Sequence, residues 1–367
     1  MAASLENYSG GTFLSDLVAR PEFLAYTSEG IFEQSKWIQS GIVQRNAALD
    51  ARAGGTRVRV PFFDPINPTE EQILSSAAWG TSTAGYLTPQ KSTADEQIMT
   101  ILHRGFAYAA DDLSKLGSGA DPLAHVRNQL TAAINKLKTT TLINQLLGLF
   151  GGISAAGVIG ANQLNASYAG VPGSMGEANY LTAANVVKAK AKLGERGDEL
   201  DTIAMHSNVA YYLQQVGMLT FSTSALAASG AITWGGGGIG VGQAEVATFA
   251  GLRVVIDDQL TYLTGGTATH AVKYPVYLFK SGVVSEGIQQ DLRLAADRNI
   301  LSMQDVIAVD YHYGFHITGT KYSNATDNPT NAGLATTGNW GLVYSTTKMV
   351  PIVRLLVNTP LDTTAYA

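Results

Sequence analysis

The chain has 367 residues, enough for two or three domains, and its 24 basic and 29 acidic residues make up only 14% of it, against about 25% in an average protein. Although 46% of the residues are hydrophobic, no run of about 18 apolar residues occurs, which excludes a membrane-spanning helix. Cysteine is absent, which excludes disulfides and thiolate chemistry, and a net charge of −5 without a basic run argues against a dedicated nucleic-acid reader.

The scarcity of charge needs an explanation, because charged side chains normally cover the surface of a water-soluble protein. Either the core is large, or much of the surface is buried against other subunits, and we favour the second because interface cores are depleted of charge. The N-terminus has no basic start followed by an apolar block. We therefore expect no signal peptide and, without cysteine, a chain that works in a reducing cytoplasm.

The first hundred residues predict extended structure. Residues 1–50 hold no segment long enough for a core and predict an arm. Residues 56–63, TRVRVPFF, alternate like a half-buried strand, which Pro61 places at an edge or an end. A second extended run covers 96–109, and the excursion between the two holds several prolines and small polar residues. The pattern predicts a long two-stranded arm that needs a neighbour to lie on.

A single long helix is predicted over residues 122–150. Asp121 can cap it, Pro122 suits the first helical position, and Gly151 and Gly152 end it. At about 1.5 Å per residue it is ~43 Å long, more than the width of a small domain. Its first apolar stripe is expected to consist of Leu123, Val126, Leu130, Ile134 and Leu137.

The second half of the chain mixes helices and strands. The expected elements are a helix capped by Thr182 within 182–199, a buried strand at 201–206, a helix capped by Ser207, and strands within 252–257, 274–284, 305–322 and 350–358. Their order is not regularly βαβ, so the fold class is predicted to be α+β.

No motif predicts a catalytic, metal or nucleotide site. The glycine-rich run 234–245 lacks the strand, helix and lysine that a phosphate-binding loop requires, so a surface loop is expected. His312 and His316 are four residues apart, but in a strand this spacing is about 13 Å, too far for one metal ion. The adjacent acids have no base or nucleophile beside them; they are Glu70–Glu71, Asp111–Asp112 and Asp257–Asp258.

The order of these elements resembles the major capsid proteins of tailed bacteriophages. Local sequences agree: DTIAMHSNVAYYLQQVG resembles the strand and helix of the axial domain, and TFAGLRVVIDDQL and VYLFKSGVVSEG resemble the strands that follow. DLRLAADRNILSMQDVIAVDYHYGFHITGTKY resembles the strands of the peripheral domain. In that family an arginine followed by an acid is common at this place, whereas here Asn299 follows Arg298.

The resemblance implies an α+β, Hong Kong ninety-seven-like capsid fold over nearly the whole chain. It implies an N-terminal arm at 1–55, an extended loop at 56–110, a peripheral domain at 111–175 and 285–335 with the spine helix 122–150, and an axial domain at 176–284 and 336–367.

The function implied is that of a major capsid protein, which self-assembles through hexamers and pentamers into the icosahedral shell around the double-stranded DNA of a tailed bacteriophage. The implied location is the virion capsid, assembled in the cytoplasm of the host. Implied partners are further copies of the chain, a portal, a decoration protein and packaged DNA contacted without sequence preference. Because the chain starts at the arm with Met1, we also expect a separate scaffold protein. No cofactor, metal, membrane or catalysis is expected.

Two alternatives stay open at this point: an encapsulin-like compartment that holds a cargo enzyme, and an enzyme whose site the sequence does not show.

The excursion between the two predicted strands supplies the candidates for contacts between subunits. It has no periodic apolar face, so its large apolar side chains can add little to the core of their own subunit. Burying such a side chain is worth about 1.5–3 kcal/mol, and aromatic residues dominate interface energies. Trp79 is therefore the expected anchor against a neighbour, and the other candidates are Ile73, Leu74, Tyr86 and Leu87.

Overall fold

A computed structural model of the chain describes most of the residues after the N-terminal segment. The described residues are 37, 40–50, 54–64, 66, 91–112, 121–152, 156–168, 170, 172–222, 246–260, 270–362 and 365–366. The predicted contact candidates between 73 and 87 and the glycine-rich run 234–245 lie outside them.

The long helix is α2, Pro122–Phe150, with the predicted bounds. The side chain of Asp121 accepts a hydrogen bond from the backbone N–H of Leu123 at 3.1 Å, so it caps the helix, and Pro122 is the first helical residue. Gly151 ends the helix with φ of 78°, a conformation that glycine adopts without strain. None of the helices among the described residues is long and apolar enough to cross a membrane.

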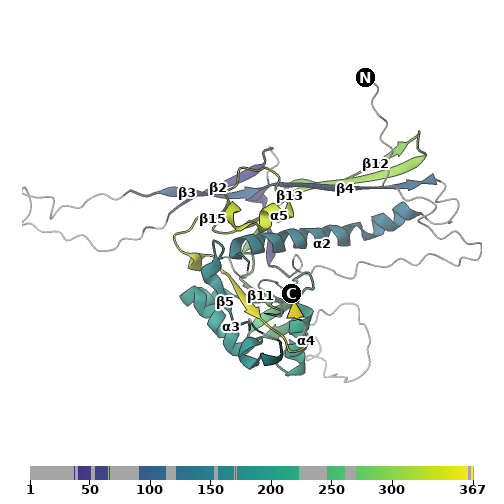
Figure 1. Ribbon diagram of the computed structural model, residues 1–367. Coiled ribbons are helices and arrows are strands. Elements are labelled where there is room, and N and C mark those ends of the chain that lie inside the picture. The colour runs from purple at the N-terminus through teal and green to yellow at the C-terminus, as the bar shows by residue number, and fades with distance from the viewer. Residues whose placement is uncertain are drawn as a thin grey trace, which may run out of the picture.

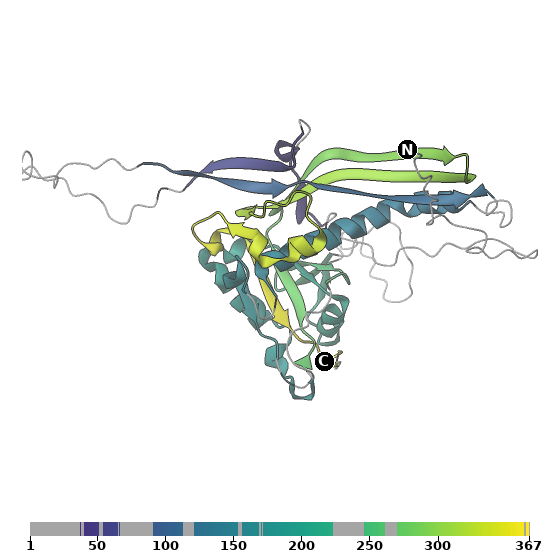
Figure 2. The same ribbon diagram turned by 45° about the horizontal axis from the view of Figure 1, so that its top comes forward.

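A long four-stranded sheet lies along α2 (Figure 1). Its strands, in spatial order, are β1 (Val43–Arg45), β12 (Val284–Asn299), β13 (Gln304–Ile317) and β4 (Leu102–Asp111). Alternate residues of β13 face the helix and are buried, among them Val309, Tyr311 and Tyr313. β12 and β13 form a hairpin whose turn lies at the same end of the molecule as the start of α2 (Figure 2).

A second four-stranded sheet holds the ribbon that leaves the molecule in the opposite direction (Figures 1 and 2). The strands, in spatial order, are β15 (Trp340–Leu342), β14 (Thr320–Tyr322), β3 (Ala94–Thr100) and β2 (Arg57–Phe63). We call the antiparallel pair β2–β3 the ribbon. Pro61 lies in β2, which is an edge strand as Pro61 predicted.

The lower part of the molecule is built on a seven-stranded sheet below the C-terminal half of α2 (Figure 1). Its strands, in spatial order, are β5 (Gln163–Asn165), β16 (Ile352–Val357), β11 (Tyr274–Phe279), β6 (Thr202–Met205), β9 (Leu252–Ile256), β8 (Val246–Phe249) and β7 (Thr220–Ser222). β16, β11 and β6 are buried along their whole length, which explains why their sequences are mostly apolar.

The remaining elements are short. Three helices are α3 (Ala183–Lys190), α4 (Ser207–Gln215) and α5 (Asn331–Ala335). The pair β10 (His270–Ala271) and β17 (Ala365–Tyr366) forms a small separate sheet. The 3-10 helices are η2 (Ala47–Leu49), η4 (Gly160–Asn162), η5 (Pro172–Ser174), η6 (Glu177–Asn179), η7 (Ala191–Glu199), η8 (Thr337–Asn339) and η9 (Thr347–Met349).

A buried arginine joins α2 to the lower sheet. Arg354 on β16 is fully buried, and its guanidinium donates to the side chain of Gln163 and, at 3.4 Å, to the carbonyls of Phe150 and Gly152. Its charge also lies 5.1 Å from the centre of the Phe150 ring. The arginine thus satisfies carbonyls at the end of the helix that no helical N–H can reach.

The structure corrects three details of the predicted elements. The cap of α4 is His206 and not Ser207, because Nδ1 of His206 accepts the hydrogen bond from Asn208 at 3.1 Å. Leu137 is exposed, because the buried stripe of α2 shifts after Ile134 to Leu142 and Leu146. The extended run 96–109 is two strands, β3 and β4, which belong to different sheets.

Candidate functional site: the assembly surfaces

The histidines singled out by their spacing do not form a site together. His312 and His316 both lie on β13, but the ring of His312 stacks on His103 with centroids 4.2 Å apart, whereas His316 hydrogen-bonds to Gln97. Burial lowers the pKa values of His312 and His316, that of His316 to about 4. Within the described part of the chain, no group of three or more His, Asp or Glu side chains could hold a metal ion.

The paired acids also serve local structure where the structure describes them. Asp258 accepts a hydrogen bond from the backbone N–H of Ser207 at 3.2 Å and lies 3.8 Å from the ring of His206. Asp112 pairs with Arg298. Glu70 and Glu71 lie outside the described residues.

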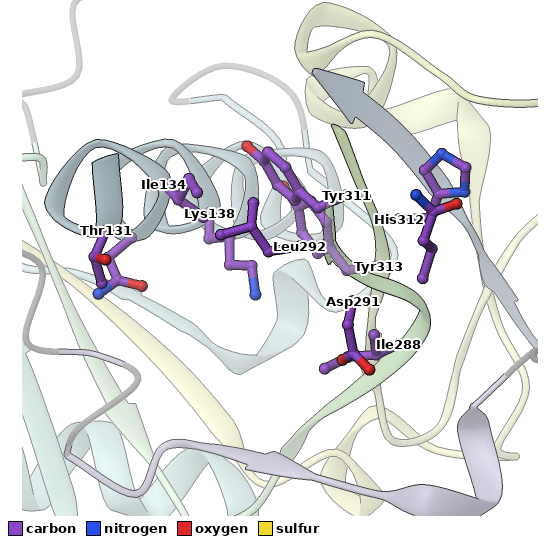
Figure 3. A pocket seen from close by; sticks show the side chains of 11 residues that line it. Thr131, Ile134, Lys138, Ile288, Asp291, Leu292, Tyr311, His312 and Tyr313 are labelled. Atoms are coloured by element: carbon purple, nitrogen blue, oxygen red, sulfur yellow. The ribbon is translucent and has the colours of Figure 1, made fainter. Parts of the chain in front are cut away.

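A cavity of about 210 Å³ lies between α2 and the long sheet (Figure 3). It is bounded by Ile134 from the helix and by Ile288, Leu292, Tyr311 and Tyr313 from the sheet. Two shifts in the register between β12 and β13 add residues to β12 along this wall of the cavity. Apolar side chains form most of the exposed area of the wall.

Lys138, which lines this cavity, belongs to a charged pair. Nζ of Lys138 lies 2.6 Å from Oε1 of Glu286 and 5.1 Å from the centre of the Tyr313 ring. The hydroxyl of Tyr313 donates to Thr141 at 3.1 Å, and burial raises its pKa. These polar contacts are internal to the subunit, and Asp291 and His312 are further polar residues in the lining of the cavity.

The outer end of the ribbon carries large apolar side chains in water. Phe63 is 78% exposed and Ile66 is 83% exposed. A shallow groove of about 630 Å³ lies beside them, with Phe62, Tyr344 and Met349 among its lining residues. Exposed apolar groups that gather beside a groove mark a surface for another molecule.

The turn of the β12–β13 hairpin is a second exposed apolar surface. Ile300 is 74% exposed and Leu301 is 73% exposed, and Met303 beside them is exposed too. We call these three residues the hairpin tip. The ribbon end and the hairpin tip lie at opposite ends of the molecule (Figures 1 and 2).

The arginine next to the hairpin tip is paired although no acid follows it in sequence. Arg298 forms ion pairs with Asp112 and, at 3.7 Å, with Asp305. Both partners lie on other segments, so the position of Asn299 after Arg298 does not prevent charge pairing here.

The lower part exposes a third group of apolar side chains, Val187 on α3 and Tyr211, Val216 and Met218 in and after α4. Together with the ribbon end and the hairpin tip, these residues give the molecule apolar surfaces at three separated places. A water-soluble monomer has no need of such surfaces, whereas a subunit with several neighbours does.

None of the contact candidates predicted from the sequence can be placed, since Trp79, Ile73, Leu74, Tyr86 and Leu87 lie outside the described residues. The sequence analysis did not predict the exposed apolar surfaces that the structure describes. The run Asn299–Met303 held a usable signal, because consecutive apolar residues at a hairpin turn are unusual. The alternation of residues 57–63 held a signal for Phe63 too, because it places Phe63 on the same face as Arg57 and Arg59.

The sequence of the chain is similar to those of known capsid proteins. A family model described as Gp13-like, major capsid protein 13-like, matches residues 152–353, more than half of the chain. The major capsid protein of Bacillus phage SPP1 is 25% identical over 348 residues, which cover 92% of this chain and 96% of that protein.

Solved phage capsids share the fold. The capsid asymmetric unit of cyanophage Pam1 is 14% identical with a TM-score of 0.57 and covers 99% of this chain and 100% of that one. The capsid of Ralstonia phage GP4 is 9% identical with a TM-score of 0.59 and covers 92% of this chain and 96% of that one. At this identity the likeness concerns the fold alone, and it confirms the α+β capsid fold that the sequence resemblance implied.

The family match covers the lower sheet apart from most of β16, together with α3, α4 and the hairpin of the long sheet, and these elements carry two of the three exposed apolar surfaces. The chain therefore belongs to the Gp13-like family of major capsid proteins.

Proposed function

We propose that copies of this chain assemble through hexamers and pentamers into the closed icosahedral shell that encloses the double-stranded DNA of a tailed bacteriophage. The shell is assembled in the cytoplasm of the host and becomes the capsid of the virion. Membership of a major capsid protein family supports this proposal.

The observation that carries the proposal is the direction of the ribbon. β2 and β3 leave the body on the side opposite to the hairpin tip (Figure 1), and their end exposes Phe63 and Ile66. A two-stranded ribbon is marginal alone in water. Its apolar end cannot fold back onto the far side of its own subunit, so a neighbouring copy has to cover it. A contact between different surfaces of identical copies closes into a ring when the rotation permits.

The domain roles follow from this arrangement. We assign two parts to the extended loop: the ribbon, and the segment 64–93 that connects its two strands. The peripheral domain consists of α2 with the long sheet. The axial domain consists of the seven-stranded sheet with its helices. β4 pairs with β13 over ten residues, which supports placing 102–111 with the peripheral domain rather than with the loop. β15 pairs with β14 beside the ribbon, so 340–342 is better grouped with the root of the loop.

Further partners are proposed from the needs of a closed shell. A scaffold protein would set the curvature during assembly, a portal would occupy one vertex, and a decoration protein would bind the outside. The packaged DNA would be contacted without sequence preference. We propose that the chain has no catalytic role.

Electron microscopy of the protein expressed with the scaffold of its own phage tests the function. We expect closed particles of uniform diameter, and particles from infected cells should contain DNA. Particles filled with a cargo enzyme would instead support a compartment of the encapsulin type. If co-expression gave only monomers and dimers, the proposed function would be wrong.

A further inference from the structure

We infer that Gln97 is a positioning residue that fixes the direction in which the ribbon leaves the body, before any neighbour is present. The inference rests on the proposed function, because it concerns how the ribbon meets the next subunit. It is carried by the contacts of Gln97 and by the close packing of the strand around it.

Gln97 links the ribbon to two other parts of the chain by buried hydrogen bonds, beside the more exposed ion pairs Arg57–Asp327 and Asp95–Lys321. It lies in β3, is only 6% exposed, and uses both ends of its amide. Its Oε1 accepts from the backbone N–H of Gly319 at 3.0 Å and from Nε2 of His316 at 2.7 Å, and its Nε2 donates to the hydroxyl of Tyr344 at 3.2 Å.

The orientation of this amide is determined by its partners. The backbone N–H of Gly319 can only donate, so the atom facing it must be the oxygen of Gln97. His316 must then donate to the same oxygen from a protonated Nε2. Because its pKa is low, the ring is neutral, and Nε2 carries its single ring proton. A side chain that satisfies three partners from two other segments, in one amide orientation, holds its strand in one position.

Two glycines bring the ribbon into contact with the long sheet beside this amide. Gly287 on β12 and Gly314 on β13 lie directly opposite each other. A Cβ at Gly314 would lie 2.7 Å from the carbonyl oxygen of Thr100, and one at Gly287 would lie 2.5 Å from the carbonyl oxygen of Leu49. Both clashes are with backbone atoms, so this pair forms a notch that only glycine permits, and the side chain of Met99 of the ribbon lies against both glycines.

The notch and the amide act on the same face of the ribbon. Gln97 and Met99 are two residues apart in β3, so both side chains point to the long sheet. Met99 forms a small core with Leu49 and Ile101, against which Val58 of the neighbouring strand packs. The notch fixes the distance of the ribbon from the sheet, and the amide prevents it from sliding or turning there. The ribbon is therefore a rigid extension of the body.

Distances in the unassembled subunit test this directly. The chain has no cysteine, so Ser92→Cys near the ribbon end and Lys192→Cys in the lower part give one pair of spin labels. In the otherwise unchanged chain we expect a narrow distance distribution. Gln97→Leu should broaden it about twofold, because three hydrogen bonds that hold one orientation are lost. Gly314→Ala should shift it, because the new Cβ pushes β3 away.

Assembly with the scaffold supplies the second measurement. Both variants should form particles of mixed diameter or open sheets, at a concentration where the unchanged chain forms uniform shells. The control is Val353→Ala in the core of the lower sheet, which should lower the midpoint of thermal unfolding while keeping the distances and the shells uniform. A narrow distribution in Gln97→Leu, or uniform shells despite a broad one, would overturn the inference. If the unchanged chain forms no shells, the proposed function fails, whereas the distances still decide the role of Gln97.

Discussion

Lys138 on α2 and Glu286 on β12 form an ion pair of 2.6 Å under the long sheet, where their side chains are 17% and 9% exposed. The pair connects the long helix to the start of the hairpin, and the Tyr313 ring lies against the lysine. It is the contact on which the first prediction depends.

Breaking this pair from one side should be costly. Lys138→Met leaves the carboxylate of Glu286 buried without its partner, and we expect the free energy of unfolding to fall by about 3 kcal/mol in urea titrations. The double variant Lys138→Met with Glu286→Leu should recover most of that loss. The matched control is the exposed pair of Arg59 and Glu96, 3.0 Å apart on the ribbon, where Glu96→Gln should cost less than about 1 kcal/mol. Equal losses at the two pairs would contradict the prediction.

Acid should destabilise the subunit through His316. Burial lowers its pKa to about 4 from the ordinary 6.5, so between these two values the unfolded chain binds the proton and the folded chain does not. The free energy of unfolding is therefore highest above pH 6.5 and falls as the pH is lowered towards 4, by on the order of 3 kcal/mol from this residue. His206 and His312, whose pKa values are lowered as well, act in the same direction.

Chemical unfolding at pH 7.5 and pH 4.5 measures this effect. His316→Asn should make the stability depend less on pH over that range than it does in the unchanged chain. An unchanged pH dependence in His316→Asn would show that the folded protein accommodates the protonated ring.

The segment between the ribbon strands should serve assembly and not folding. Replacing residues 66–92, which include Trp79, by a short glycine–serine linker leaves both strands of the ribbon in place. We expect a soluble subunit with a circular dichroism spectrum close to that of the full chain, and no shells. Aggregation or unfolding of the shortened chain would mean that the segment belongs to the core, and normal shells would remove the basis of the extended-loop assignment.

The hairpin tip should likewise matter only between subunits. Ile300→Ser combined with Leu301→Ser removes apolar groups that are 74% and 73% exposed, so the midpoint of thermal unfolding should change by less than about 1 °C per side chain. Assembly should become at least tenfold slower in light scattering, because each lost apolar contact is repeated in every subunit of the shell. Unchanged assembly would mean that the tip faces solvent in the particle.

The sequence predicted those elements whose signals are local. The bounds of α2 follow from Asp121, Pro122 and Gly151, which act on the helix ends by their own hydrogen bonds and dihedral angles. The fully buried strands were predictable because their sequences are mostly apolar. The prediction of the residue that caps α4 was wrong by one position, because a histidine nitrogen can replace the serine hydroxyl that the pattern favours.

What the sequence left undetermined depends on partners far along the chain. Alternation predicted extended structure over 96–109 but not that the chain changes sheets near Ile101, because alternation identifies a face and not a neighbouring strand. The hydrogen bond between Gln97 and His316 joins residues 219 positions apart, and no local sequence pattern around either residue indicates the other as its partner. Surfaces for other subunits were indicated by a shortage of charge and, at the hairpin turn, by the consecutive apolar residues Ile300 and Leu301, but their exposure is a property of the fold.

The anchoring of α2 by Arg354 gives the subunit a defined path for mechanical load. The guanidinium holds the carbonyls of Phe150 and Gly152 at the helix end and belongs to β16, which is paired with β11 over six residues and with β5 on its other side. Load on the helix end therefore passes through the guanidinium into these two ladders of hydrogen bonds. A container under internal pressure would thus yield at the contacts between its subunits before it yields within them.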